Sequence, residues 1–342
     1  MWMIMKKCME LPLIEPVYRT FNFDSAGSAI AKDNPSIRNW YLNEIMITTC
    51  SRDFITTGYT SPKLWIVDSV YTQNPHITRK RYEIKYLGSG VHAVIRNFID
   101  DGFYVFFWGM DDYYFKGKSW YHEKHAPHDG MITGYDTEND TYTVYAYDKR
   151  WILQKFKTPK RALSKAIKSG LAQNHNAYLD AIKVKTEPVS LCPEAICKKL
   201  KSYLDSSLEK YPPDRGGTVY GIAVHEYLVM YLEKLFSEEI PYERMDRRIC
   251  RFLWEHKKVM LERIVEVEKA LSLGNEISSK YKFIVKEAEN MRMMYASFNH
   301  RRRNSLLMDI KDKLLYIHEN EKILLTRFVE MMEQALEAKN KE

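Results

Sequence analysis

The spacing of apolar residues along the chain changes near residue 175. Before that point, short runs of aromatic and β-branched residues alternate with polar turns, which is the pattern of strands with a few helices between them. Beyond it, apolar residues recur every three or four positions over long stretches, as in amphipathic helices. The pattern predicts an α+β domain over residues 1–175, followed by an all-α helical domain over residues 176–342.

Strand signals in the first part are clearest in an aromatic run at residues 102–115 and in two alternating segments, 131–136 and 141–148, that flank the polar turn TEND. Two segments instead show helical periodicity. One begins at a proline and covers residues 35–50, and the other lies between glycines at residues 91–99. We therefore expect a β-hairpin and at least two helices in this domain.

Four long runs in the second part predict helices over residues 221–236, 243–271, 277–299 and 303–338. The apolar faces of the last two fit either of two roles. They form the core of a helical bundle, or they pair two subunits in a homodimer. The residues concerned are Met291, Met294, Leu306, Leu307, Leu314 and Leu315.

Composition narrows the class of protein. With 342 residues, of which 45% are hydrophobic and 13% aromatic, the chain can bury sizeable cores and does not have the composition of a disordered protein. No run of about 18 apolar residues occurs, so no transmembrane helix and no membrane partner are expected. The cysteines are five in number and form no CxxC pair, which indicates reduced thiols in a cytoplasmic protein.

The net charge of +7 is a mild excess, but it is concentrated locally. Residues 151–179 contain no acid and six basic residues, and a second cluster covers residues 301–303. These clusters are either solvated helix faces or docking surfaces for an acidic partner. No nucleic-acid-binding motif accompanies them, so a nucleic acid is not expected. The six basic residues are Lys155, Lys157, Lys160, Arg161, Lys165 and Lys168.

The predicted hairpin carries the candidate chemistry. His128 opens its first strand and Asp148 closes its second, so antiparallel pairing would bring the two side chains together. An imidazole oriented by a carboxylate is a general base, because the carboxylate fixes the tautomer and stabilises the protonated ring. The alternative is a well-formed hairpin in which His128 has only a structural role.

Two other groups of residues suggest chemistry less clearly. His122, His125 and His128 have spacings that resemble a metal site, but no cysteine or acidic ligand completes it. Asp111 and Asp112 end an aromatic strand, and neighbouring residues of a strand point to opposite faces, so at most one of them enters a given site. We expect neither a metal nor a cofactor.

Several strings resemble the butirosin-biosynthesis protein H N-terminal family, whose members are papain-like proteins of specialised metabolism. The strings FYVFFWGMDDYYF (103–115) and HAPHDGMITGYDTENDTYTVYAYD (125–148) are similar to the papain-like domain of that family. GTVYGIAVHEYL (217–228) and FLWEHKKVMLERI (252–264) are similar to the helical part that follows it in many relatives. The resemblance covers most of the chain and implies a papain-like, cysteine-peptidase type of fold for the first domain.

The resemblance also implies an activity. Family members of known function move an acyl or peptidyl group from a phosphopantetheine thioester on an acidic carrier protein to a small amine, as in nonribosomal peptide and antibiotic biosynthesis. His128 and Asp148 match the family's histidine and aspartate. We therefore expect either an acyltransferase, or a hydrolase of the same thioester if water is the acceptor, or a non-catalytic scaffold that binds a carrier protein or a peptide intermediate.

One position departs from the family pattern. The nucleophilic cysteine of the family lies at the start of the first helix, but residues 17–31 contain none, and Asp24 and Ser25 stand in its place. Three explanations remain open. Ser25 is the nucleophile, or Cys8 or Cys50 folds back into the site, or the thiol chemistry has been lost and the cleft binds, positions or catalyses through His128 and Asp148 without a covalent intermediate.

Overall fold

The structure, a computed structural model, describes residues 7–16, 18–30, 35–56, 61–67, 71–173, 177–207 and 217–341. The chain divides into two compact units, and both are discontinuous in sequence. The sheet unit comprises Met1–Ile37 and Val70–Pro188, and the helical unit comprises Arg38–Ser69 and Val189–Glu342. The α+β class is confirmed, but the division differs from the predicted split at residue 175, because an early segment of the chain belongs to the helical unit.

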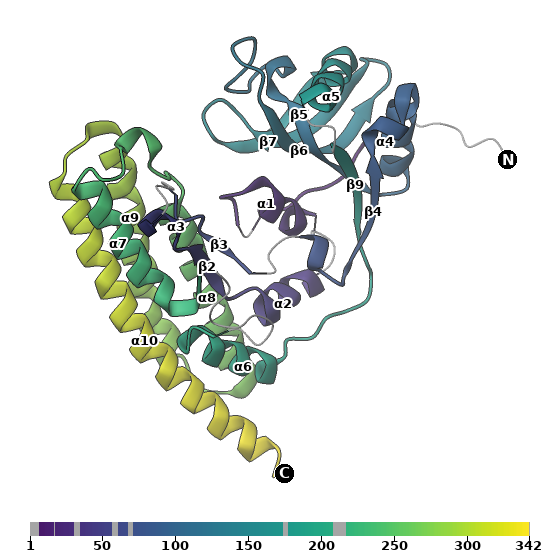
Figure 1. Cartoon of the computed structure of the whole chain (residues 1–342). Helices are drawn as coiled ribbons and strands as arrows, with labels where there is room; N and C mark the ends of the chain where they lie inside the picture. Colours follow the sequence, from purple (N-terminus) through teal and green to yellow (C-terminus); the bar gives the residue numbers. More distant parts are fainter. Residues whose placement is uncertain are drawn as a thin grey trace. The chain divides into compact units, whose positions relative to one another are not determined.

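Seven strands among the described residues form the antiparallel sheet of the first unit, in the order β4-β9-β5-β6-β7-β8, and β1 pairs with β6 (Figure 1). The predicted hairpin is confirmed as β6 and β7. The strands are β1 (Cys8–Glu10), β4 (Ile77–Glu83), β5 (Tyr104–Asp111), β6 (Pro127–Asp136), β7 (Thr141–Tyr147), β8 (Leu153–Pro159) and β9 (Tyr178–Val184).

Helices cover both faces of this sheet, and α1 and α5 lie on opposite sides of it (Figure 1). Side chains alternate between the two faces along β5, so the strand can pack against helices on both sides. On the side of α1, Trp108 stacks on Phe23 at 6.4 Å between ring centroids. On the other face, His92 of α4 and Ser164 of α5 are hydrogen-bonded at 2.7 Å. The helices are α1 (Asn22–Ala29), α4 (Val91–Asp100), which was predicted, and α5 (Lys160–Gln173).

The helix α5 approaches β5 more closely than a side chain would allow. The pairing of β5 with β6 shifts register between Phe107 and Met110, and Gly109 within this bulge has a φ of +93°. A Cβ atom added to Gly170 of α5 would lie 1.9 Å from the carbonyl oxygen of Gly109. Gly109 and Gly170 therefore permit the close packing of α5 against the end of β5.

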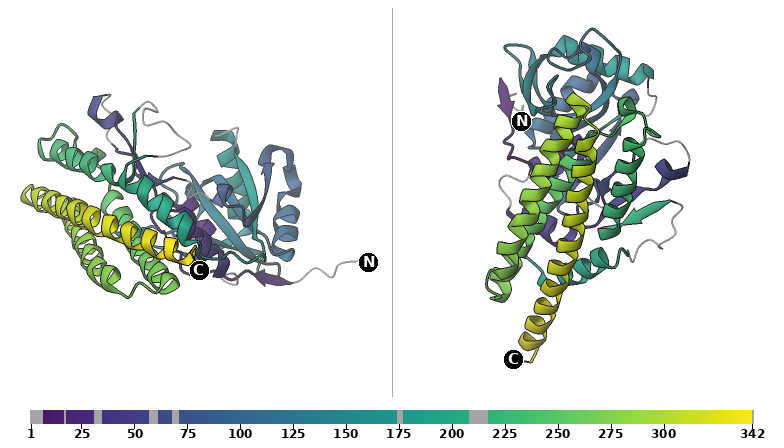
Figure 2. Two further views of the ribbon diagram at one scale, coloured as in Figure 1. Left: turned by 90° about the horizontal axis from the view of Figure 1, so that it is seen from below. Right: turned by 90° about the vertical axis from the view of Figure 1, so that its left-hand side faces the viewer.

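Three helices dominate the second unit, and short connections join them. They are α8 (Ile249–Leu271), α9 (Glu276–Arg301) and α10 (Ser305–Lys339), and Figure 2 shows α9 and α10 running side by side. Each has a continuous buried stripe at helical spacing, as their sequences predicted. The smaller elements are α2 (Pro35–Glu44), β2 (Thr48–Ser51), α3 (Asp53–Thr56), β3 (Trp65–Ile66), α6 (Pro193–Leu204), β10 (Thr218–Tyr220) and α7 (Val224–Phe236).

The helix predicted over residues 35–50 is shorter than expected. It ends at Glu44, and Cys50 lies in β2, which pairs with β10 and β3. The buried side chain of Arg263 donates to the carbonyl oxygens of Leu42 and Ile45 at 2.7 Å each, which stabilises the helix end. No helix in the described ranges has both the length and the hydropathy needed to cross a bilayer.

We expect Gly170→Ala to lower the free energy of unfolding by about 1–3 kcal/mol, because the new methyl group forces α5 away from β5. Urea unfolding measures this change. Gly90→Ala is the matched control, since Gly90 has a φ of −75° and nothing lies within 4 Å of its added Cβ. Equal stability of the two variants would contradict the close contact.

Candidate functional site

Two aspartate–histidine pairs form where β5 ends and β6 begins. Asp111 is the last residue of β5, and Asp112 opens the short 3-10 helix η4 (Asp112–Tyr114). His125 precedes β6, and His128 pairs with Met110 across the ladder. Asp111 bonds His125 and Asp112 bonds His128, each at 2.6 Å from the ring Nδ1 atom.

The pair of Asp112 and His128 has the geometry of a general base. The Asp112 side chain is 6% exposed, whereas that of His128 is 46% exposed. The second oxygen of Asp112 lies 3.3 Å from the ammonium group of the buried Lys118. A buried, ion-paired carboxylate therefore holds Nδ1 of a ring whose Nε2 atom has no hydrogen-bond partner among the described residues.

The pair of Asp111 and His125 is built differently. Ser169 and Gln173 of α5 also donate to Asp111, at 2.6 and 3.1 Å, so its carboxylate is shared by several donors on the α5 side of the sheet. Burial acts to raise the pKa of Asp111, but the hydrogen bonds from Ser169 and His125 lower it overall. We regard this pair as a structural link between α5 and β5.

Asp129 adds a second carboxyl group beside His128. Burial raises its pKa to about 6, although the nearby His128 opposes the shift. The backbone N–H of Gly109 donates to this carboxyl group, and the side chain of Asn22 donates to the Asp129 carbonyl oxygen at 2.9 Å. Neighbouring residues of a strand point to opposite faces, so we do not assign this carboxyl group to the same site as the His128 ring.

Asp148 does not pair with His128, which corrects the sequence prediction. Its carboxylate accepts hydrogen bonds from the backbone of Arg150 and Ile152, at 2.8 and 2.9 Å, and from the Gln154 side chain at 2.7 Å. Burial acts to raise the pKa of Asp148, but these backbone donors hold it below its usual value. The ladder of β6 and β7 ends before reaching Asp148, and donors in its own turn occupy the carboxylate.

Ser25 does not have the geometry predicted for a nucleophile. It is fully buried in α1, and its hydroxyl donates to the carbonyl oxygens of Phe21 and Asn22 at 2.7 and 3.1 Å. A hydroxyl that bonds its own helix in this way is structural. The side chain that links the start of α1 to β6 is Asn22, which the sequence analysis did not single out.

Of the two candidate cysteines, Cys8 belongs to the sheet unit and Cys50 to the helical unit. Cys8 is exposed and pairs with Asp136, eight residues beyond His128 along β6, or about 26 Å at the rise of a strand. Cys50 belongs to the helical unit, where burial raises the pKa of its thiol to about 12. The sheet unit therefore brings neither thiol to the imidazole.

Half of the residues in the predicted basic cluster form ion pairs. Lys155 and Lys157 form ion pairs with Glu10, and Lys160 forms one with Asp140. The other three, Arg161, Lys165 and Lys168, project from α5 with no ion pair among the described residues. In the second cluster, the guanidinium of Arg302 packs on the ring of Tyr242 at 5.4 Å.

No family model matches the chain, and a search of curated proteins returns no match. In the described part of the chain, no three His, Cys, Asp or Glu side chains group as metal ligands. The papain-like assignment therefore depends on the resemblance of the quoted strings.

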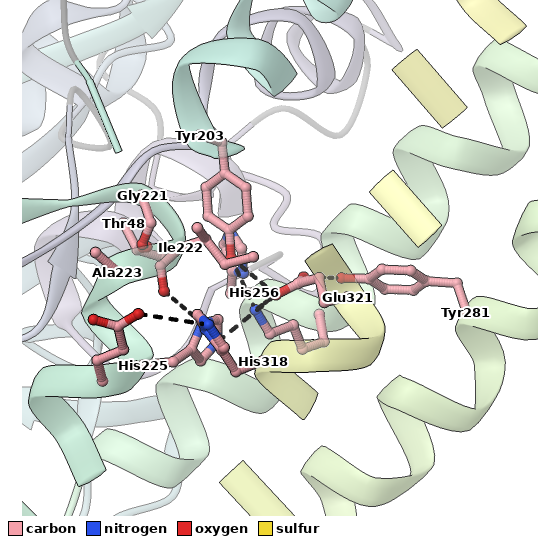
Figure 3. Close-up of polar contacts among 12 residues, drawn as sticks. Thr48, Tyr203, Gly221, Ile222, Ala223, His225, His256, Tyr281, His318 and Glu321 are labelled. Carbon is pink, nitrogen blue, oxygen red and sulfur yellow. Dashed lines mark hydrogen bonds and ion pairs between the residues drawn. The ribbon is translucent and has the colours of Figure 1, made fainter. Parts of the chain in front are cut away.

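A second concentration of titratable groups lies inside the helical unit, centred on Glu321 of α10 (Figure 3). Lys257 of α8 donates to Glu321 at 2.6 Å, Tyr203 of α6 donates at 3.0 Å, and Tyr281 of α9 donates to its other oxygen. His225 of α7 lies 3.7 Å from the same carboxylate. Five helices thus converge on one ion-paired carboxylate.

This network is structural, because all of its members are sealed from solvent. Lys257, Glu321, Tyr203 and Tyr281 are each 0% exposed and His225 is 1% exposed. Two of the strings that carry the family resemblance contribute to it, residues 217–228 and 252–264. Its polar residues occupy positions on the buried stripes of their helices. A polar residue at such a position is the feature of the sequence that could have pointed to this network.

Removing one partner of this network should destabilise the protein strongly. We expect Lys257→Met to lower the free energy of unfolding by about 3–5 kcal/mol, because it leaves the Glu321 carboxylate buried without its cation. The double variant Lys257→Met/Glu321→Leu should recover much of the loss, as urea unfolding would show. Additive losses in the double variant would contradict the coupling.

The buried histidines make stability depend on pH. Burial lowers the pKa values of His225 and His256 well below the ordinary value, and the nearby Lys257 charge adds to the effect. Their neutral forms are therefore favoured in the folded state, and the unfolded chain takes up protons first as the pH falls. The free energy of unfolding should decrease below pH about 6.5, by about 1.4 kcal/mol per pH unit for each histidine.

Urea unfolding between pH 6.5 and 5 tests this dependence. The variant His225→Gln/His256→Gln removes both titrations and should show a flatter slope, whatever its absolute stability. An unchanged slope in that variant would assign the dependence to other groups.

Proposed function

We propose that the protein transfers an acyl group from a carrier-protein thioester to an amine, with His128 as general base and without a covalent enzyme intermediate. The observation that carries the proposal is the 2.6 Å hydrogen bond between the half-exposed His128 and the buried Asp112. The resemblance to the butirosin-biosynthesis protein H family supplies the reaction class and the papain-like fold. The reaction class and the papain-like fold are therefore both part of what we propose.

In the proposed reaction, the amine nitrogen attacks the thioester carbonyl carbon while Nε2 of His128 accepts the proton of the nitrogen. The Asp112 carboxylate holds Nδ1–H and stabilises the imidazolium that forms. The carbon–sulfur bond then breaks, and the thiolate takes the proton from the imidazolium. The products are an amide and the free thiol of the carrier arm, so the ring returns to its starting state.

The direct route is preferred over an acyl-enzyme because, in the described part of the sheet unit, none of the predicted nucleophiles lies at His128. The Ser25 hydroxyl bonds its own helix, Cys8 lies far along β6, and Cys50 belongs to the other unit.

The same missing nucleophile favours a second candidate function. A papain-like scaffold that has lost its thiol would bind a carrier protein or a peptide intermediate without turnover. Water in place of the amine would make the protein a thioester hydrolase. An assay that follows amide, free acid and bound carrier together distinguishes these three activities.

We expect His128→Gln to reduce amide formation by about 10²–10⁴-fold, because the general base is lost. The assay incubates the protein with an acylated carrier protein and an amine, and quantifies the amide by mass spectrometry. His125→Gln is the matched control, since its ring bonds Asp111, the aspartate next to Asp112, and not Asp112 itself.

Full activity in His128→Gln would remove the proposed base, and equal losses in both variants would assign the effect to local folding. A stable acyl adduct on the unsubstituted protein would contradict the direct route.

A further inference from the structure

The turn that follows β7 is organised by Asp148. Besides the backbone of Arg150 and Ile152, this carboxylate accepts from the side chain of Gln154 in β8. The backbone closes the turn a second time, because Asp148 N–H donates to the Ile152 carbonyl at 2.9 Å and Trp151 N–H donates to the Asp148 carbonyl at 3.0 Å. The turn is therefore held in one conformation from both ends.

This rigid turn presents apolar side chains to solvent. Trp151 is 61% exposed and Ile152 is 47% exposed, and no large apolar side chain of α5 is similarly exposed. Trp151 also has a φ of +60°, a left-handed conformation that costs a bulky residue about 1–3 kcal/mol. Strain of this kind persists only where the surroundings enforce it, and here the Asp148 hydrogen bonds do so.

Basic residues flank the apolar pair. Lys149 and Arg150 are both exposed, and Lys116 is exposed in the neighbouring loop. The single acid of the turn, Asp148, is buried and pairs with the Arg150 guanidinium at 3.4 Å, so Lys149 and Arg150 still leave the turn with a net positive charge. An apolar centre with a positive rim is complementary to an acidic surface that has an apolar middle.

The turn is connected directly to the candidate site. Lys149 N–H donates to the Gly117 carbonyl oxygen at 2.7 Å, and the next residue, Lys118, pairs with Asp112. Asp112 in turn holds His128. A partner docked on the turn would therefore lie beside the loop that carries Lys118, the cation paired with Asp112.

We propose that residues 149–152 are the docking surface for the acidic carrier protein, with Trp151 inserted into its surface and Lys149 and Arg150 against its carboxylates. This inference rests on the proposed function, because it names where the partner of that reaction binds. The stripe of Arg161, Lys165 and Lys168 on α5 is the competing surface. It offers charge without an exposed large apolar residue, whereas the turn offers both an exposed tryptophan and an arginine, two of the residue types that dominate binding energies at interfaces.

The test compares two substrates with the same acyl group. The first is an octanoyl group tethered to a carrier protein, and a panel of acidic acyl carrier proteins is tested in turn. The second is octanoyl-N-acetylcysteamine, a free thioester. Trp151→Ala should lower the preference for the tethered substrate, measured as a ratio of kcat/KM values, by about tenfold or more. Trp151→Gly should do the same without a loss of thermal stability, because glycine relieves the positive φ.

Two control variants make the result specific. Tyr86→Ala removes an aromatic side chain that is 77% exposed elsewhere on the sheet unit, and it should leave the preference unchanged. The triple variant Arg161→Ala/Lys165→Ala/Lys168→Ala tests α5. An unchanged preference in Trp151→Ala, or a loss in the triple variant alone, would overturn the inference.

Direct binding separates this inference from the proposed function. If no thioester reacts, the dissociation constant of each carrier is measured by biolayer interferometry, and weaker binding of Trp151→Ala still supports the docking surface. Absence of binding by every carrier overturns it. The protein is also tested for binding to vesicles of anionic lipid. If Trp151→Ala weakens binding to the vesicles but not binding to the carrier, the surface is assigned to a membrane and the inference is overturned.

Discussion

The candidate site depends on the burial of Asp112 between two basic groups. A carboxylate removed from water is destabilising unless it is paired and hydrogen-bonded, and Lys118 and His128 together meet that requirement. The end of β5 makes the arrangement possible, because Asp111, its last residue, bonds α5, and Asp112, the first residue of η4, bonds His128. One strand end thus supplies both a structural pair and a catalytic candidate.

Local patterns predicted the local structure. The hairpin of β6 and β7, the helix α4 and the long helices α8, α9 and α10 all follow from periodicity. The assignment of residues 38–69 to the helical unit could not be predicted, because it depends on β2 pairing with β10, whose residues lie more than 160 positions later: Ser51 pairs with Thr218. Periodicity does not encode pairing between segments so distant in sequence.

The candidate site, too, could be predicted only in part. His128 was identified from its place at the head of a strand, but its carboxylate was not. The hairpin register alone favours Asp148, and only the full structure shows that the turn occupies Asp148 while η4 delivers Asp112. The network around Glu321 was also missed, since a lysine or glutamate on an apolar stripe is not recognisable as buried until its partners from other helices are known.

The discontinuous division of the chain has a consequence for how the protein can be taken apart. The strand β9 lies between β4 and β5 in the sheet, yet it follows residue 175 in sequence. A fragment ending there would keep β4 and β5 with one long edge of each unsatisfied, and such edges pair with other chains. The halves of this polypeptide are thus not interchangeable modules, and fusion or recombination at the apparent sequence boundary should yield insoluble products.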